Sequence, residues 1–205
     1  MQLGRGKNRI SVRVHPISAL FWVGILLLDR SEELLLSLLA AFLHEGGHLM
    51  AMRGCGIGIT RLTVYPMGFD IHKEEKISSY RSDFLIASAG VFTNLLFALL
   101  GAGILPLLGE GGRWMEIFIA SNLLLSGVNL LPYPGLDGGE MLRTLLLFRF
   151  SPEGAGKAVR CLADGLLPIL FCGVLYLLFY AKGNVTVYLF CAYLAVSLVR
   201  RGGGE

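Results

Sequence analysis

Three residues that could form a metal site stand close together in this chain: His44, Glu45 and His48, in the pattern His-Glu-x-x-His. They lie inside an apolar run, residues 34–52. On a helix, residues four apart project from one face, so both imidazoles could bind one Zn²⁺ while Glu45 acts as a base on a nearby water. A core helix with two chance histidines is the alternative. Burying these groups in an apolar run is costly unless they are paired, bind a metal or line a wet cavity, so we favour the metal site.

A catalytic zinc usually takes three protein ligands, and Asp137 is the best candidate for the third. It follows residues 129–135, whose prolines and glycine break a helix, and precedes two glycines that allow a sharp bend. In the alternative interpretation, Asp137 caps the next helix after an ordinary turn. Beside His-Glu-x-x-His, the ligand interpretation is favoured. Glu140 is a rival ligand that fits better as an acid in the first turn of a helix.

The composition places these residues in a membrane protein. Of the 205 residues, 54% are hydrophobic and 16% are charged, and the mean hydropathy is +0.64. Soluble domains carry about 25% charged residues. We therefore predict an all-α polytopic membrane protein, with residues 1–205 forming a single membrane-embedded domain. The net charge of +3, without a basic stripe, argues against nucleic-acid binding. The four cysteines form no Cys-x-x-Cys pair, so a disulfide framework or zinc ribbon is not expected.

Apolar stretches predict about six transmembrane helices. They are residues 14–28, 34–52, 84–108, 114–131, 166–180 and 185–199. Between the second and third, segments 57–65 and 69–77 are rich in β-branched and aromatic residues and flank a Pro-Met-Gly turn, which predicts a small membrane-associated β-hairpin. A polar, helix-prone stretch, 140–164, follows the fourth span.

The charges predict the orientation. All but three of the 18 Lys and Arg residues fall on one side of this topology, the exceptions being Arg30, Arg113 and Lys182. By the positive-inside rule, the protein is multi-pass with both termini cytoplasmic. At about 1.5 Å per residue, His48 and His44 then lie roughly 7 and 13 Å below the cytoplasmic boundary. The fourth span also runs inward, so Asp137 reaches the same leaflet.

These two motifs, in this order and on these spans, resemble the site-2 protease family of intramembrane zinc metalloproteases. The His15-Pro16 start and the Pro66-Met-Gly-Phe69 turn are most similar to the sporulation branch of that family. The resemblance implies regulated cleavage of a membrane-tethered protein, which in the sporulation branch is an inactive sigma-factor precursor. It implies Zn²⁺ at His44, His48 and Asp137, and membrane inhibitor or regulator proteins as partners. It also implies residence in a bacterial inner or forespore-surrounding membrane.

The chain departs from the family pattern in several places. Val91 stands where the family often has proline, between Gly90 and Asn94. No PDZ domain fits the loop 109–113, and we expect no C-terminal nucleotide-sensing domain.

Some polar and small residues near the motifs have two interpretations each. Asn94 either faces the site or makes an interhelical hydrogen bond. Asn129 is a weak candidate donor to a developing oxyanion. Gly46 and Gly47 let another backbone approach closely, either a neighbouring span or a substrate strand.

Two other functions are compatible with the same residues. A metal transporter or channel could use the His/Asp cluster as a pathway, although transport has no obvious need for Glu45. A catalytically silent membrane scaffold or chaperone would lack zinc or cut nothing. For a protease, the predicted hairpin over 57–77 could hold the unwound substrate as an added strand.

Overall fold

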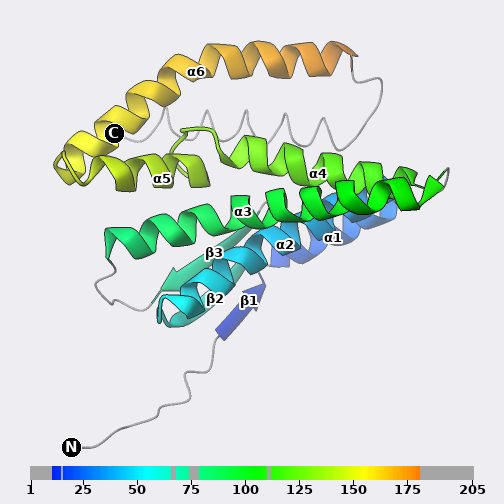
Figure 1. Ribbon diagram of the computed structural model, residues 1–205, viewed down its shortest axis with the longest axis horizontal. Coiled ribbons are helices and arrows are strands. Elements are labelled where there is room, and N and C mark those ends of the chain that lie inside the picture. The colour runs from blue at the N-terminus through cyan, green and yellow to red at the C-terminus, as the bar shows by residue number, and fades with distance from the viewer. Residues whose placement is uncertain (1–10, 15, 66–67, 74–78, 110–111, 181–205) are drawn as a thin grey trace, which may run out of the picture.

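The computed structural model describes residues 11–14, 16–65, 68–73, 79–109 and 112–180 (Figure 1). The sixth predicted span, 185–199, lies outside this range. The elements in chain order are β1 (Ser11–Val14), α1 (Pro16–Leu28), α2 (Glu32–Gly54), β2 (Ile59–Tyr65), β3 (Gly68–Lys73), α3 (Tyr80–Ile104), the 3-10 helix η1 (Leu105–Leu107), α4 (Arg113–Asn129), α5 (Asp137–Leu146) and α6 (Pro152–Tyr180).

Helices α2, α3 and α4 pack against one another and form the centre of the molecule. The small sheet lies on one side of this bundle and α6 on the other (Figure 1). Hydroxyl groups join the helices: Ser37 on α2 lies 3.1 Å from Ser121 on α4, and Ser126 on α4 donates to the Val91 carbonyl on α3 at 3.4 Å. Such polar links are favoured between helices surrounded by lipid, where water cannot replace them.

The charged residues at the ends of α2 explain why it is longer than the apolar run at 34–52. Ser31 caps its N-terminus by accepting a hydrogen bond from the Leu34 amide, and Glu32 and Glu33 occupy the first turn. Arg53 lies in the last turn. Acids at the start and a base at the end are stabilised by the helix dipole, so the helix continues two residues beyond the apolar run at each end.

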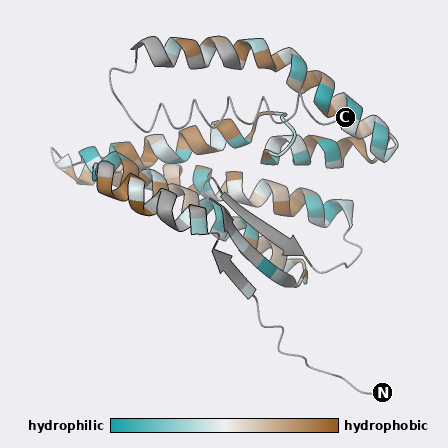
Figure 2. Ribbon diagram, turned by 180° about the vertical axis from the view of Figure 1, so that it is seen from behind, coloured by the Kyte–Doolittle hydropathy of each residue, from teal (hydrophilic) through white to brown (hydrophobic). Residues whose placement is uncertain are grey.

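Two of the described helices are long and apolar enough to cross a membrane: α2, and α3 continued to Leu107. Helices α1 and α4 are shorter, with 13 and 17 residues. Figure 2 shows apolar residues along much of the helices. Many of them point outward, since Phe42, Leu99 and Leu124 are 64–71% exposed. Contact of such apolar faces with lipid is favourable, whereas their exposure to water is unfavourable.

The sheet has the strand order β1-β2-β3, with β2 in the middle. Strand β2 pairs antiparallel with β3, from Tyr65 opposite Gly68 to Ile59 opposite Lys73, with an irregularity at Ile59/Arg61. The sequence predicted strand-forming segments at 57–65 and 69–77, of which 74–77 lie outside the described residues. Strand β1 pairs parallel with β2 and was not predicted, because residues so far apart in the chain carry no local pairing signal.

The end of the described chain differs from the prediction. The sequence separated a polar stretch at 140–164 from a span beginning at 166, but α6 runs unbroken from Pro152 to Tyr180. Pro168 lies inside this helix, and the ribbon bends along α6 (Figure 1). A proline removes one backbone hydrogen bond and kinks a helix without ending it when its neighbours hold the two halves.

Candidate metal centre

The structure brings His44 and His48 on α2 together with Asp137 at the start of α5. The Oδ2 atom of Asp137 lies 3.0 Å from Nε2 of His44 and 3.2 Å from Nε2 of His48. The two Nε2 atoms are 3.2 Å apart. Both histidines are buried, at 5% and 8% exposure. Among the described residues, these three form a group of side chains that could hold a metal ion.

The outer ring nitrogens determine where the imidazole protons lie. Nδ1 of His44 is 3.1 Å from Oδ1 of Asn94, and Nδ1 of His48 is 2.7 Å from the carbonyl oxygen of Ile86. Both partners are acceptors, so each neutral imidazole carries its proton on Nδ1 and leaves a lone pair on Nε2. The two Nε2 atoms and the Asp137 carboxylate therefore face one another without a proton to share.

This arrangement is unfavourable by itself and favourable around a cation. Oδ2 of Asp137 is buried and has no hydrogen-bond partner in the described part of the chain, although both Nε2 atoms are near. Ligands about 2.0–2.1 Å from a tetrahedral zinc ion lie about 3.3 Å apart, close to the separations seen here. The donor set thus fits Zn²⁺.

Asp137 is positioned by the break between α4 and α5. The chain turns there through hydrogen bonds from Tyr133 to the Leu131 carbonyl and from Leu136 to the Tyr133 carbonyl. A Cβ atom on Gly138 or Gly139 would overlap the carbonyl groups of Leu130 or Tyr133. The two glycines therefore let α5 begin directly against the turn, which directs its first residue toward α2.

The alternatives considered for Asp137 do not match the structure. Leu136 occupies the cap position of α5, and Asp137 is the first helical residue. Glu140, the rival ligand, is exposed and lies 3.0 Å from Arg143, outside the cluster. Asn129, the weak candidate for an oxyanion donor, bonds to the Leu125 carbonyl of its own helix. Glu45 is half-buried beside His44 on α2, and its role stays a prediction.

Glycines set the close approach of α2 and α3 at the site. A Cβ on Gly47 would meet the Thr93 hydroxyl and, at 2.7 Å, the Ala89 carbonyl, whereas Gly46 has no atom within 4 Å. Of the two uses left open for these glycines, Gly47 serves helix packing. A Cβ on Gly90 would overlap the imidazoles themselves. No role for Gly90 was predicted from the sequence, although its four-residue spacing from Asn94 places both on one face of α3.

The chain was compared with known proteins. No family model matches it. It is 34% identical over 141 residues to the zinc metalloprotease Rip3 of Mycobacterium tuberculosis, covering 63% of this chain and 35% of the relative. It is 26% identical over 190 residues to stage IV sporulation protein FB of Bacillus subtilis, covering 92% and 65%. The fold is similar to that of the site-2 protease from Methanocaldococcus jannaschii, with a TM-score of 0.62 over 89% of this chain and 86% of that one.

The chain is thus similar in sequence and in fold to proteins of the site-2 protease family. The structural likeness, at 21% sequence identity, concerns the fold alone. The chain spans about a third of the length of the mycobacterial relative and 65% of the sporulation protein. The similarity to site-2 proteases, together with two helices long and apolar enough to cross a membrane, indicates an integral membrane protein. The expected resemblance to this family is thereby confirmed.

Proposed function

We propose that this chain is an intramembrane zinc metalloprotease that cuts a membrane-tethered protein near the cytoplasmic leaflet. One observation carries the proposal: three buried atoms with lone pairs, from His44, His48 and Asp137, converge without a proton between them. A glutamate follows the first of these histidines directly in the sequence. This combination of two helical histidines, a third ligand and an adjacent carboxylate suits hydrolysis of an amide bond.

The residues divide the work between holding a metal and moving a proton. A zinc ion held by His44, His48 and Asp137 would lower the pKa of a bound water to about 7 and polarise the substrate carbonyl. Glu45 takes the proton from the attacking water and later delivers it to the leaving amine. Both histidines are buried on α2 against α3, which holds their donor atoms in place.

The sheet offers a place for an unwound substrate. Peptide bonds inside a helix are protected by their hydrogen bonds, so a transmembrane substrate must become extended before it is cut. Strand β3 is an edge strand that pairs with β2 on one side only among the described strands. We propose that the substrate adds to this edge through main-chain hydrogen bonds.

The finer features of the proposal come from the sequence and the family relationship. Six spans with both termini in the cytoplasm follow from the apolar stretches and the distribution of Lys and Arg. A sporulation sigma-factor precursor as substrate is supported by the similarity to stage IV sporulation protein FB alone. Membrane proteins that inhibit or regulate the protease belong to the same proposal, as does a single membrane-embedded domain over residues 1–205.

The experiment that tests the proposal compares Glu45→Gln with Glu116→Gln. Both substitutions remove one carboxylate from a helix, but Glu116 lies exposed in the first turn of α4. Each variant and the wild type are co-expressed with candidate membrane-tethered substrates, and cleavage is followed on immunoblots. We expect wild type and Glu116→Gln to cleave and Glu45→Gln to lose nearly all cleavage while keeping its zinc. Equal cleavage by Glu45→Gln would contradict the proposed base, and zinc transport without cleavage would favour a transporter.

A further inference from the structure

One face of α3 carries three positions that contact the imidazoles: Ile86, Gly90 and Asn94, spaced four residues apart. Residues at this spacing share a helix face. They meet the face of α2 that carries His44 and His48. Asn94 lies beside His44, Ile86 lies beside His48, and Gly90 lies between the two rings. Each histidine on α2 thus has its own partner on α3, and Gly90 lies where the two rings meet that helix.

We propose that Asn94 and Gly90 are positioning residues that set the tautomer of His44 and the space in which both histidines meet the metal. The inference rests on the metal site of the proposed function. It assigns to α3, which supplies none of the three ligands, control over how tightly those ligands bind zinc. Partners of this kind orient metal-binding histidines and raise their basicity.

Asn94 holds His44 through both ends of its amide. Its Nδ2 donates to the Ala40 carbonyl at 3.2 Å, and its Oδ1 accepts from Nδ1 of His44 at 3.1 Å. The first bond fixes which way the amide points, because only the nitrogen end can donate to a carbonyl. Oδ1 must then face His44, which keeps the ring proton on Nδ1 and the lone pair of Nε2 on the metal side. The side chain is fully buried, so no water competes for these bonds.

His48 is oriented differently, by the main chain. Its Nδ1 donates to the carbonyl of Ile86 at 2.7 Å, a bond that no side-chain substitution at position 86 removes. Within an α-helix that carbonyl already accepts from the amide four residues later, which is that of Gly90. Of the two histidines, only His44 can therefore be tested by a side-chain substitution of its Nδ1 partner, Asn94.

Gly90 makes room for the two rings. A Cβ at this position would overlap Nε2 of His48 and lie 2.7 Å from both Cε1 and Nε2 of His44. These Nε2 atoms are the ones that face Asp137. Any side chain at position 90 would therefore push the donor atoms apart or occupy the place of the metal.

The test of Asn94 measures zinc affinity by chelator competition on purified full-length protein, together with thermal unfolding. Asn94→Leu should weaken zinc binding by about 10- to 100-fold. Asn122→Leu is the matched control: Asn122 is equally buried, but among the described residues its side chain bonds only to the Phe118 carbonyl of its own helix. This control should keep the wild-type zinc affinity. Asn94→Asp should recover most of the loss, since a carboxylate oxygen can still accept from Nδ1 of His44.

Gly90→Ala gives an independent test, with Gly103→Ala on the same helix as its control, because Gly103 has no atom within 4 Å. The Gly90 variant should lose nearly all zinc, and the Gly103 variant should keep it. Wild-type zinc affinity in both Asn94→Leu and Gly90→Ala would overturn the inference. So would equal losses in Asn94→Leu and Asn122→Leu, since general destabilisation would then explain them. A wild type that cleaves without zinc would instead overturn the proposed function.

Discussion

Asp137 and Glu140 lie three residues apart on α5 and meet opposite environments. The Asp137 carboxylate is largely buried against two imidazoles, whereas Glu140 is exposed and paired with Arg143. An exposed ion pair of this kind contributes little to stability, about 0–1 kcal/mol, and Glu140 is not part of the described His44, His48 and Asp137 group. A buried carboxylate without a hydrogen-bond donor needs a cation.

The contrast predicts the outcome of removing each carboxylate. Asp137→Ala should lower both zinc affinity and cleavage, because two histidines remain where three ligands were. Glu140→Ala should change neither. Zinc content and turnover are measured together on the two purified variants. Full occupancy and activity in Asp137→Ala would remove this residue from the site.

Residue types and spacing made the three proposed ligands predictable, and the same reasoning reached only part of their surroundings. His-Glu-x-x-His and an aspartate after a broken helix are local patterns with a direct chemical meaning. The sequence left two interpretations of Asn94 open, a residue that faces the site or an interhelical hydrogen bond. In the structure its amide does both, because it bonds to the Ala40 carbonyl on α2 and lies beside His44. Ile86 acts through its main chain and Gly90 through the side chain it lacks, so neither gives a signal in the residue types.

At the scale of the elements, the contact between α2 and α3 is closest at Gly47. The neighbouring Gly46 points to open space, so the two adjacent glycines differ in what a methyl group would meet.

This difference predicts separate effects of the same substitution. Gly47→Ala should destabilise the protein by about 1–3 kcal/mol, as overpacking does, and should weaken zinc binding by shifting α2 against α3. Gly46→Ala should be neutral or slightly stabilising, because alanine favours the helix. Thermal unfolding in detergent measures both. Equal effects at the two positions would show that the helices do not pack in this way.

Because β2 is the central strand of the sheet, a substitution in it tests whether the substrate binds to the edge of β3. Val64 is opposite Val14 in β1 and Phe69 in β3, so Val64→Pro disrupts a central strand and, with it, the edge that β3 offers. Cleavage should fall while zinc content stays unchanged, since no ligand comes from the sheet. Unaltered cleavage of every tested substrate would rule out strand addition.

Elements with strong local signals were easier to predict than those that depend on distant partners. The apolar runs at 34–52 and 84–108 correspond to α2 and to α3 with η1. Strand β1 depends on β2, 45 or more residues further along the chain, and was missed. The unbroken α6 was missed because its polar first half and apolar second half read as two segments.

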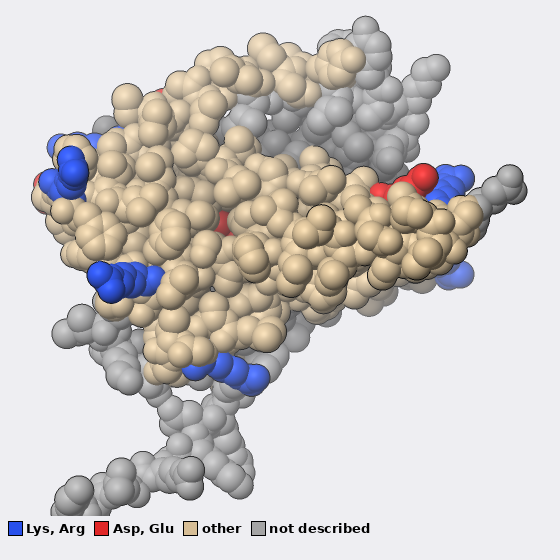
Figure 3. All heavy atoms as spheres, in the orientation of Figure 1, with Lys and Arg blue, Asp and Glu red and all other residues tan. Residues whose placement is uncertain are grey.

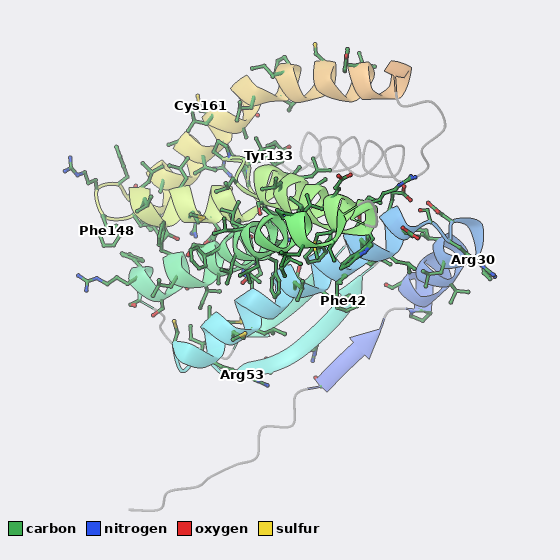
Figure 4. The ribbon with its side chains drawn as sticks, turned by 45° about the vertical axis from the view of Figure 1, so that its right-hand side comes forward. Arg30, Phe42, Arg53, Tyr133, Phe148 and Cys161 are labelled. Atoms are coloured by element: carbon green, nitrogen blue, oxygen red, sulfur yellow. The ribbon has the colours of Figure 1, made fainter. Side chains whose placement is uncertain are left out.

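For the whole molecule, charge separates the two ends. Figure 3 shows Lys and Arg at one end of the described part and a mixture of acids and bases at the other, with a largely uncharged face between them. Figure 4 places Arg30 and Arg53 toward opposite ends of α2. At the mixed end, Arg113 at the start of α4 lies 3.4 Å from Glu33 on α2. At the other end, Tyr80 packs edge-on against Phe148 with ring centres 5.8 Å apart. Tyrosine is enriched at membrane–water interfaces.

The distribution of charge between the two ends predicts on which side of the membrane each loop and terminus lies. Reporter fusions at Glu205 and in the loop 109–113 should report opposite sides, with Glu205 in the cytosol. If both report the same side, the number of spans is wrong, and so is the proposed depth of the site near the cytoplasmic leaflet.

The central claim is that the three converging donor atoms bind a zinc ion on which cleavage depends. Metal analysis of purified, active wild-type protein, with cleavage assayed on the same sample, tests this most directly. We predict one zinc per chain, loss of cleavage when a strong chelator removes it, and recovery when Zn²⁺ is returned. Active protein that contains no zinc would contradict the account.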